Sequence, residues 1–138
     1  MVSRHRQASR AFTLVELIVV IIILAILAAV GIPQYRKSLE RSRGAEAYAG
    51  LAAIQEGEKI YYATNEAYYN GALDNSGEAA LDIQLPQKGW TFALSGANNQ
   101  VFTGTATRNG GPCVNNAMTI IENGALNDNV WRGCIDNL

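Results

Sequence analysis

The amino-acid sequence predicts an α+β protein, in which a long N-terminal helix carries an antiparallel sheet packed on its C-terminal half. Three observations support this class. A long apolar run occupies the N-terminal third, apolar residues then recur at helical spacing, and the last third changes to short β-branched and aromatic runs. The 138 residues leave room for one small domain. We expect an N-terminal segment at 1–11, an apolar helix at 12–33 and a head at 34–138, with the whole helix covering about 12–62.

The N-terminal segment and the apolar run together indicate export to a membrane. Arg4, Arg6 and Arg10 precede the run without an acidic residue between them. Such a basic segment is typical of exported chains, and its charge keeps that end cytoplasmic. Residues 12–32 would make about 31 Å of helix, which matches a hydrocarbon core of roughly 30 Å. A membrane-spanning helix is therefore predicted; the alternative is a signal peptide cut near Ala28.

Glu16 is the one charged residue between Ala11 and Ile32. A carboxylate at bilayer depth costs roughly 2.5–3.5 kcal/mol on insertion scales. No cation lies at that depth on the same helix, so the partner of Glu16 is expected on another copy of the chain. The alternative is a carboxylate that reaches the interface beside the leader arginines.

The motif FTLVE at 12–16, the basic segment before it, the apolar run and PQY at 33–35 resemble a type IV prepilin. The resemblance implies that a prepilin peptidase cuts between Ala11 and Phe12, and that the new amine of Phe12 is methylated. The family usually has Gly before the cut, where this chain has Ala11. Glu16 would then meet the amine of a neighbouring subunit and set the subunit register.

The resemblance also implies a function. The chain would be a structural subunit of a type IV pilus, a fibre for adhesion, motility or DNA uptake, with no enzymatic activity and no cofactor. Its implied partners are other pilin copies, the prepilin peptidase, the membrane, and an inner-membrane platform with its assembly ATPase. The precursor would reside in the inner membrane and the mature chain in a cell-surface pilus. The alternatives are a type II secretion pseudopilin in a periplasmic pseudopilus and, less favoured, a membrane-anchored adhesin or enzyme.

Gly31 and Pro33 close the apolar run. Proline removes a helical hydrogen bond and bends the axis, and glycine weakens the same turn. A kink or local melt is therefore predicted around residues 28–33, and the resemblance implies that this segment loosens on assembly. The alternative is that these residues only mark the exit from the bilayer.

The upper helix is predicted to be amphipathic. Its apolar face comprises Ala47, Leu51, Ile54 and Tyr61. Glu40 is expected on the charged face, where it can pair with Lys37 or Arg43. Three glycines interrupt this stretch, and we expect them to allow close approach of a sheet or helix, a looser helix being the alternative. They are Gly44, Gly50 and Gly57.

Residues 64–89 are predicted to form a connecting loop with one short helix at 76–83, capped by Ser76. Tyrosines at its start are expected to pack on the helix: Tyr61, Tyr62, Tyr68 and Tyr69. Strands are expected at 90–94, 101–107 and 118–122, with a type I′ hairpin turn at Asn123-Gly124. A fourth strand is expected at 130–135.

Cys113 and Cys134 are the two cysteines, and both lie in the exported part, where a disulfide can form. It would close a loop of 20 residues and stabilise the head by roughly 3 kcal/mol. In the pilin family a C-terminal disulfide of this kind holds the last strands, and it favours a pilus over a pseudopilus; free thiols are the alternative.

Sequence motifs for catalysis are lacking, because the single histidine, His5, lies in the leader and no P-loop or metal-spaced set occurs. No metal site is predicted. Four oxygen-bearing residues could offer ligands to calcium, although a polar turn explains them equally well: Asn127, Asp128, Asn129 and Asp136. The scattered cations Lys88, Arg108 and Arg132 give no support for nucleic-acid binding.

Overall fold

The structure is a computed structural model that describes residues 12–86 and 88–138. Its first element is the 52-residue helix α1 (Leu14–Asn65), which ends three residues later than the sequence predicted. The described chain divides into two compact units after Tyr35. The predicted leader, residues 1–11, lies outside the described residues.

In the first unit every side chain from Phe12 to Tyr35 is exposed. This part of α1 is long and apolar enough to cross a membrane, a property that a signal sequence near the N-terminus would share. The helix is continuous through Gly31 and Pro33. The predicted kink or melt at residues 28–33 stays a prediction.

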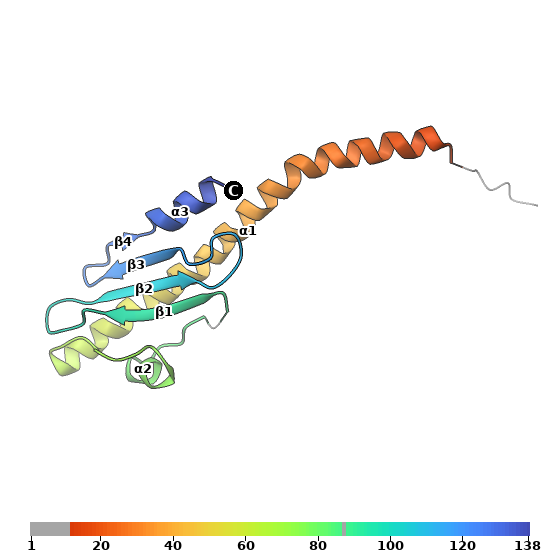
Figure 1. Ribbon diagram of the computed structural model, residues 1–138. Helices are drawn as coiled ribbons and strands as arrows, with labels where there is room; N and C mark the ends of the chain where they lie inside the picture. Colours follow the sequence, from red (N-terminus) through yellow and green to blue (C-terminus); the bar gives the residue numbers. More distant parts are fainter. Residues whose placement is uncertain (1–11, 87) are drawn as a thin grey trace, which may run out of the picture. The chain divides into compact units, whose positions relative to one another are not determined.

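The second unit, residues 36–138, contains a four-stranded antiparallel sheet in the order β1-β2-β3-β4 (Figure 1). The strands are β1 (Trp90–Ser95), β2 (Thr103–Arg108), β3 (Ala117–Ile121) and β4 (Leu126–Asn127). Trp90 pairs with Arg108 and Ala106 pairs with Met118, which fixes the register of the three longer strands. The α+β class is confirmed.

Alternate residues of the sheet face the second half of α1. Phe92, Ala106 and Met118 belong to one buried cluster with Leu51 and Ile54 of the helix. The predicted apolar face is thus confirmed for Ala47, Leu51 and Ile54, while Tyr61 is only half-buried and lies outside the cluster. Burial of this face together with the sheet face supplies the main driving force for folding.

The helix glycines let the sheet and the C-terminal helix approach closely. A Cβ on Gly50 would lie 2.4 Å from the Phe92 ring, and one on Gly44 would lie 2.0 Å from the Trp131 ring. The close-approach interpretation is confirmed, because neither aromatic ring could keep its position above a larger residue.

The predicted fourth strand at 130–135 is wrong. This segment forms the helix α3 (Asn129–Asp136), whose buried residues are Trp131 and Ile135. Two apolar residues four apart lie on one side of a helix, and burial of that side outweighs the weak β preference of so short a run. The fourth strand is instead the two-residue β4.

Two local details also differ from expectation. The hairpin at Asn123-Gly124 is present, but only Gly124 has a positive φ, of 82°, so its turn is not type I′. Gly124 N–H donates to Ile121 O at 2.8 Å, the pattern of a type I turn followed by a left-handed glycine. The short helix α2 spans Asn75–Ala80, and Asp74 Oδ1 accepts from Gly77 N–H in its first turn at 3.2 Å; the predicted cap at Ser76 stays a prediction.

Candidate assembly surface on the N-terminal helix

The carboxylate of Glu16 forms a capping box with Thr13 at the start of α1. Glu16 Oε2 accepts from the backbone N–H and from the hydroxyl of Thr13, both at 2.9 Å. In return, Thr13 Oγ1 accepts from Glu16 N–H at 3.2 Å. This reciprocal arrangement satisfies donors that a helix start otherwise leaves open.

The sequence analysis missed the capping box, although a Thr three residues before a Glu at the start of an apolar run is its signature. Both bonds to the carboxylate end on Oε2. Within residues 12–86 and 88–138, Oε1 of Glu16 has no partner, and no cation of that part of the chain forms an ion pair with it. One oxygen therefore remains available for a partner outside the described residues.

The apolar side chains around Glu16 are exposed on all sides of the helix. Phe12 is 86% exposed and Leu17 is 62% exposed. A surface of this size without a covering element marks a membrane or protein interaction site. Phe12 and Glu16 share this surface with Gly31 and Pro33, whereas Ala11 lies outside the described residues.

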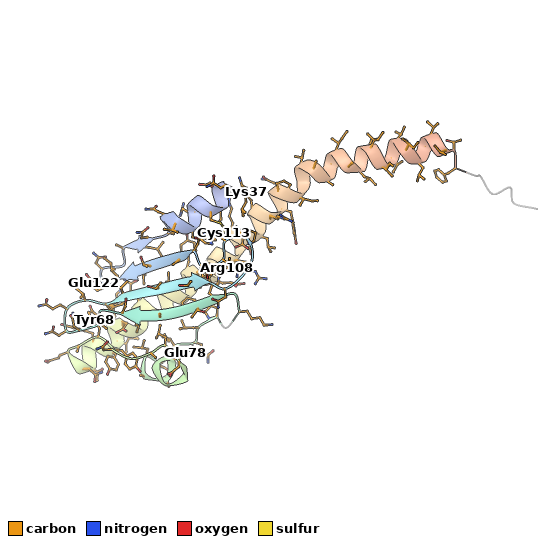
Figure 2. The ribbon with its side chains drawn as sticks, in the orientation of Figure 1. Lys37, Tyr68, Glu78, Arg108, Cys113 and Glu122 are labelled. Atoms are coloured by element: carbon orange, nitrogen blue, oxygen red, sulfur yellow. A yellow bond between two sulfur atoms is a disulfide. The ribbon has the colours of Figure 1, made fainter. Side chains whose placement is uncertain are left out.

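The other predicted pair lies in the head. Cys113 and Cys134 form a disulfide, which confirms that prediction. It joins the segment after β2 to α3, with the two Cα atoms 5.8 Å apart (Figure 2). The C-terminal helix is thereby tied to the sheet.

A buried ion pair in the head corrects the interpretation of Glu40. Its carboxylate does not pair with Lys37 or Arg43; Oε1 and Oε2 each accept from Arg108 at 3.2 Å. Arg108 also donates to Gly89 O at 2.7 Å and lies over the Trp90 ring. Because both side chains are almost fully buried, this pair fixes how the end of β2 sits on α1.

A second polar cluster joins α3 to α1. Asp128 accepts from the Tyr48 hydroxyl and from Arg132 Nε. Burial raises the pKa of the Asp128 carboxyl, but the hydrogen bonds from Tyr48 and Arg132 outweigh it and hold that pKa below its ordinary value. Two of the four residues considered for calcium thus have side-chain oxygens in local hydrogen bonds, because Asn127 Oδ1 also accepts, from Asn129 N–H at 3.2 Å.

Glu58 is a buried carboxylate for which the sequence predicted no role. It is fully buried; Oε2 accepts from Tyr69 N–H at 2.8 Å, while Oε1 has no hydrogen-bond partner within the described chain. Burial raises its pKa, and the bond from Tyr69 lowers it to a smaller extent. The loop after α1 is held at this point, and the nearby tyrosine rings pack as expected, with Tyr62 on Tyr68 at 4.7 Å.

Comparisons with known proteins agree with this geometry. The family model described as type IV minor pilin ComP, DNA uptake sequence receptor, matches residues 33–116. The model of the prokaryotic N-terminal methylation motif matches residues 6–32. Together they cover the apolar helix and most of the head.

Similar individual proteins are fimbrial subunits. The fimbrial protein EcpC of Eikenella corrodens is 32% identical over 127 residues, covering 89% of this chain and 79% of the relative. The type IV major pilin protein PilA of Myxococcus xanthus is 39% identical over 67 residues, covering 49% of this chain and only 30% of that relative. A fimbrial protein of Pseudomonas aeruginosa is 26% identical over 142 residues, covering 91% of this chain and 85% of the relative.

An exposed apolar helix joined to a sheet-bearing head defines a membrane-anchored, filament-forming class of protein. The chain belongs to the type IV pilin family, whose members matched here are structural fimbrial proteins and not enzymes.

Proposed function

We propose that the chain is made as a prepilin, cut between Ala11 and Phe12, and methylated at the new amine of Phe12. Residues 12–33 hold the precursor in the inner membrane and later form the core of a cell-surface pilus. An assembly platform and its ATPase move the subunit from one environment to the other. In the filament, Glu16 docks on the amine of a neighbouring Phe12 and sets the axial register.

The observation that carries this proposal is the open Oε1 of Glu16 on an otherwise apolar, fully exposed helix surface. A carboxylate in such surroundings needs a cation, and the described residues of the same chain supply none. Cleavage before Phe12 creates an α-amine, so a neighbouring copy of the same chain can supply this cation without any other partner. Buried pairs of this type contribute little net stability but can specify register.

The energetics favour a reversible fibre. Lipid tails and packed helices are both apolar, so exchanging one for the other changes the free energy little. An external motor can then drive assembly or disassembly, and the Glu16 contact selects the position at which each subunit stops.

Glu16 variants test the docking role. Glu16→Gln keeps an acceptor for Thr13 and removes the charge, whereas Thr13→Ala removes the cap and keeps the charge. We expect Glu16→Gln to insert into membranes normally and to lose surface filaments, while Thr13→Ala still assembles. Sheared filaments and membrane fractions are quantified by immunoblot. Normal filament yield from Glu16→Gln would refute the register role.

Processing is tested separately by mass spectrometry of the mature chain. We expect an N-terminal peptide that begins at methylated Phe12. An intact Met1, or a start near Ala28, would contradict the prepilin route whatever the filament assay gives.

Two observations, one structural and one from the matched family, bear on the kind of fibre that the chain builds. The Cys113–Cys134 disulfide favours a pilus over a pseudopilus. Among adhesion, motility and DNA uptake, the description of the matched family model, a DNA uptake sequence receptor, favours DNA uptake. Transformation frequency of a deletion strain, with twitching and adhesion measured in parallel, tests this role; a strain that loses only motility or adhesion would exclude it.

A further inference from the structure

The first turns of the head carry an uncompensated positive surface, which we call the juxtamembrane basic cluster. It consists of Arg36, Lys37 and Arg41. Arg36 and Arg41 are exposed, and neither forms an ion pair with any residue between 12 and 138 that the structure describes. Lys37 donates to the carbonyl oxygen of Asp136 at 3.1 Å, so its charge is not neutralised by a carboxylate.

The buried ion pair explains why this cluster stays positive. Glu40 sits within the same turns of α1 and would offset one of the charges, but its carboxylate is turned inward and fully used by Arg108. The next acidic residue along the helix, Glu46, pairs with Arg43 at 3.3 Å. The exposed charge of the stretch 36–41 is therefore +3, in a chain whose formal net charge is −1.

A recess beside the cluster offers room for a small anionic group. Arg41 lines a groove with a volume of about 290 Å³, together with Arg132 of α3. Tyr48, Trp131 and Ile135 also line the groove, and so does one acidic residue, Asp136. Arg132 already forms an ion pair with Asp128, so Arg41 is the lining cation without a carboxylate partner among the described residues, and its guanidinium is a donor group suited to a phosphate.

Chain connectivity decides which anion the cluster meets first. Arg36 follows Ile32, the last residue of the apolar run, by four positions. While residues 12–33 span the bilayer, the cluster is tethered at the level of the lipid headgroups. Basic residues beside a membrane helix are attracted to anionic headgroups, by about 1 kcal/mol each, or roughly fivefold in affinity.

We propose that the juxtamembrane basic cluster binds anionic phospholipid headgroups on the outer face of the inner membrane. The subunit waits there before assembly, and its head is held at the bilayer surface until the lipid contact is exchanged for contacts in the fibre. This inference rests on the membrane stage of the proposed function. A neighbouring subunit is the competing partner for the same surface.

Native mass spectrometry of the full chain, released from detergent micelles, tests the inference with phosphatidylglycerol and phosphatidylcholine of identical acyl chains. The test variant is Arg36→Gln/Arg41→Gln, and the control is Lys59→Gln/Lys88→Gln, which removes the same charge from exposed positions elsewhere on the head. Lys37 is kept because it contacts α3. Any leader charge is the same in all three chains.

We expect the unaltered chain to retain phosphatidylglycerol over phosphatidylcholine. Losing two arginines at about fivefold each should lower this preference roughly 25-fold, and the control should stay within about twofold of the unaltered chain. An unchanged preference in Arg36→Gln/Arg41→Gln, or an equal loss in the control, overturns the inference. A variant that keeps the lipid preference but builds no filaments assigns the cluster to a neighbouring subunit.

Flotation with neutral phosphatidylcholine vesicles tests separately whether the chain inserts into a membrane at all, which is the part of the proposed function on which this inference rests. If all three chains fail to float, the membrane stage of the proposed function is refuted and the inference falls with it. If all three float equally and only the headgroup preference is missing, the inference alone is refuted.

Discussion

Replacing Arg108 should lower the free energy of unfolding of the head by more than any single substitution at an exposed position. The Arg108→Met variant loses both hydrogen bonds to Glu40 and the bond to Gly89 O, and it leaves the carboxylate 2% exposed and unpaired. Breaking one partner of a buried ion pair typically costs about 3–5 kcal/mol. With a urea m value of about 1.5 kcal/mol/M for a head of this size, the unfolding midpoint should fall by about 2–3 M.

A double variant separates the cost of the orphaned charge from the worth of the pair. In Glu40→Met/Arg108→Met both charges are gone, and methionine fills part of the space that each side chain leaves. Replacing a whole buried pair by apolar residues is often neutral or stabilising. We expect the double variant to be about 2–4 kcal/mol more stable than Arg108→Met. With the Glu40→Met single variant the cycle is complete, and it should show a large coupling energy between the two neighbours.

Tryptophan fluorescence provides the assay, because both tryptophans of the chain, Trp90 and Trp131, are buried in the head. Urea unfolding is followed in detergent with the disulfide intact, so that the apolar helix stays solvated. If Arg108→Met cost less than about 1 kcal/mol, or if the two single variants added without coupling, the pair would not be the buried contact described here.

Three further changes have definite expected outcomes. Gly44→Ala should lower the urea midpoint, because its Cβ would lie 2.0 Å from the Trp131 ring, while Gly133→Ala, with nothing within 4 Å, should raise stability by about 0.5–1 kcal/mol; equal effects would contradict the packing. The folded pKa of Glu58 is raised, so its ionisation destabilises the head as pH rises above the unfolded pKa of about 4.3. Glu58→Gln should therefore stabilise the head at pH 7 and give no gain below pH 4 in urea titrations, and a pH-independent difference would refute this reading. Replacing Cys113 and Cys134 by Ser should cost roughly 3 kcal/mol in the same assay under oxidising conditions, and equal midpoints for reduced and oxidised protein would contradict it.

Periodicity predicted the helix and the three longer strands, because both signals extend over many residues. The same periodicity also contained the signal for Glu40, which the sequence analysis placed on the charged face. Glu40 precedes Ala47 by seven residues, or two helical turns, and so lies on the apolar side. Arg108 continues the inward-facing positions of Gly104 and Ala106. The sequence therefore places one acid, Glu40, on the apolar side of the helix and one base, Arg108, on the inward side of a strand. An ion pair between these two residues could have been predicted from these positions.

The C-terminal helix could not be predicted in the same way. Eight residues are too few for a stable isolated helix, so α3 depends on tertiary contacts. Its contacts are the Trp131 ring over Gly44, the disulfide, and the Asp128 cluster with Tyr48. Each joins residues distant in sequence, and local propensity carries no information about them.

Two acids on α1 differ in whether the described chain supplies them with a cation. Glu40 and Glu16 both occupy positions where water should be scarce, one in the head core and one on a helix suited to lipid. The chain provides an internal cation for Glu40, in Arg108, whereas none of residues 12–86 and 88–138 forms an ion pair with Glu16. Both oxygens of Glu40 accept from Arg108, so this carboxylate is used within the fold. Both described bonds to the Glu16 carboxylate, from Thr13, end on Oε2, so Oε1 keeps the capacity to accept from one more donor, and the docking that we propose on a neighbouring subunit depends on that capacity.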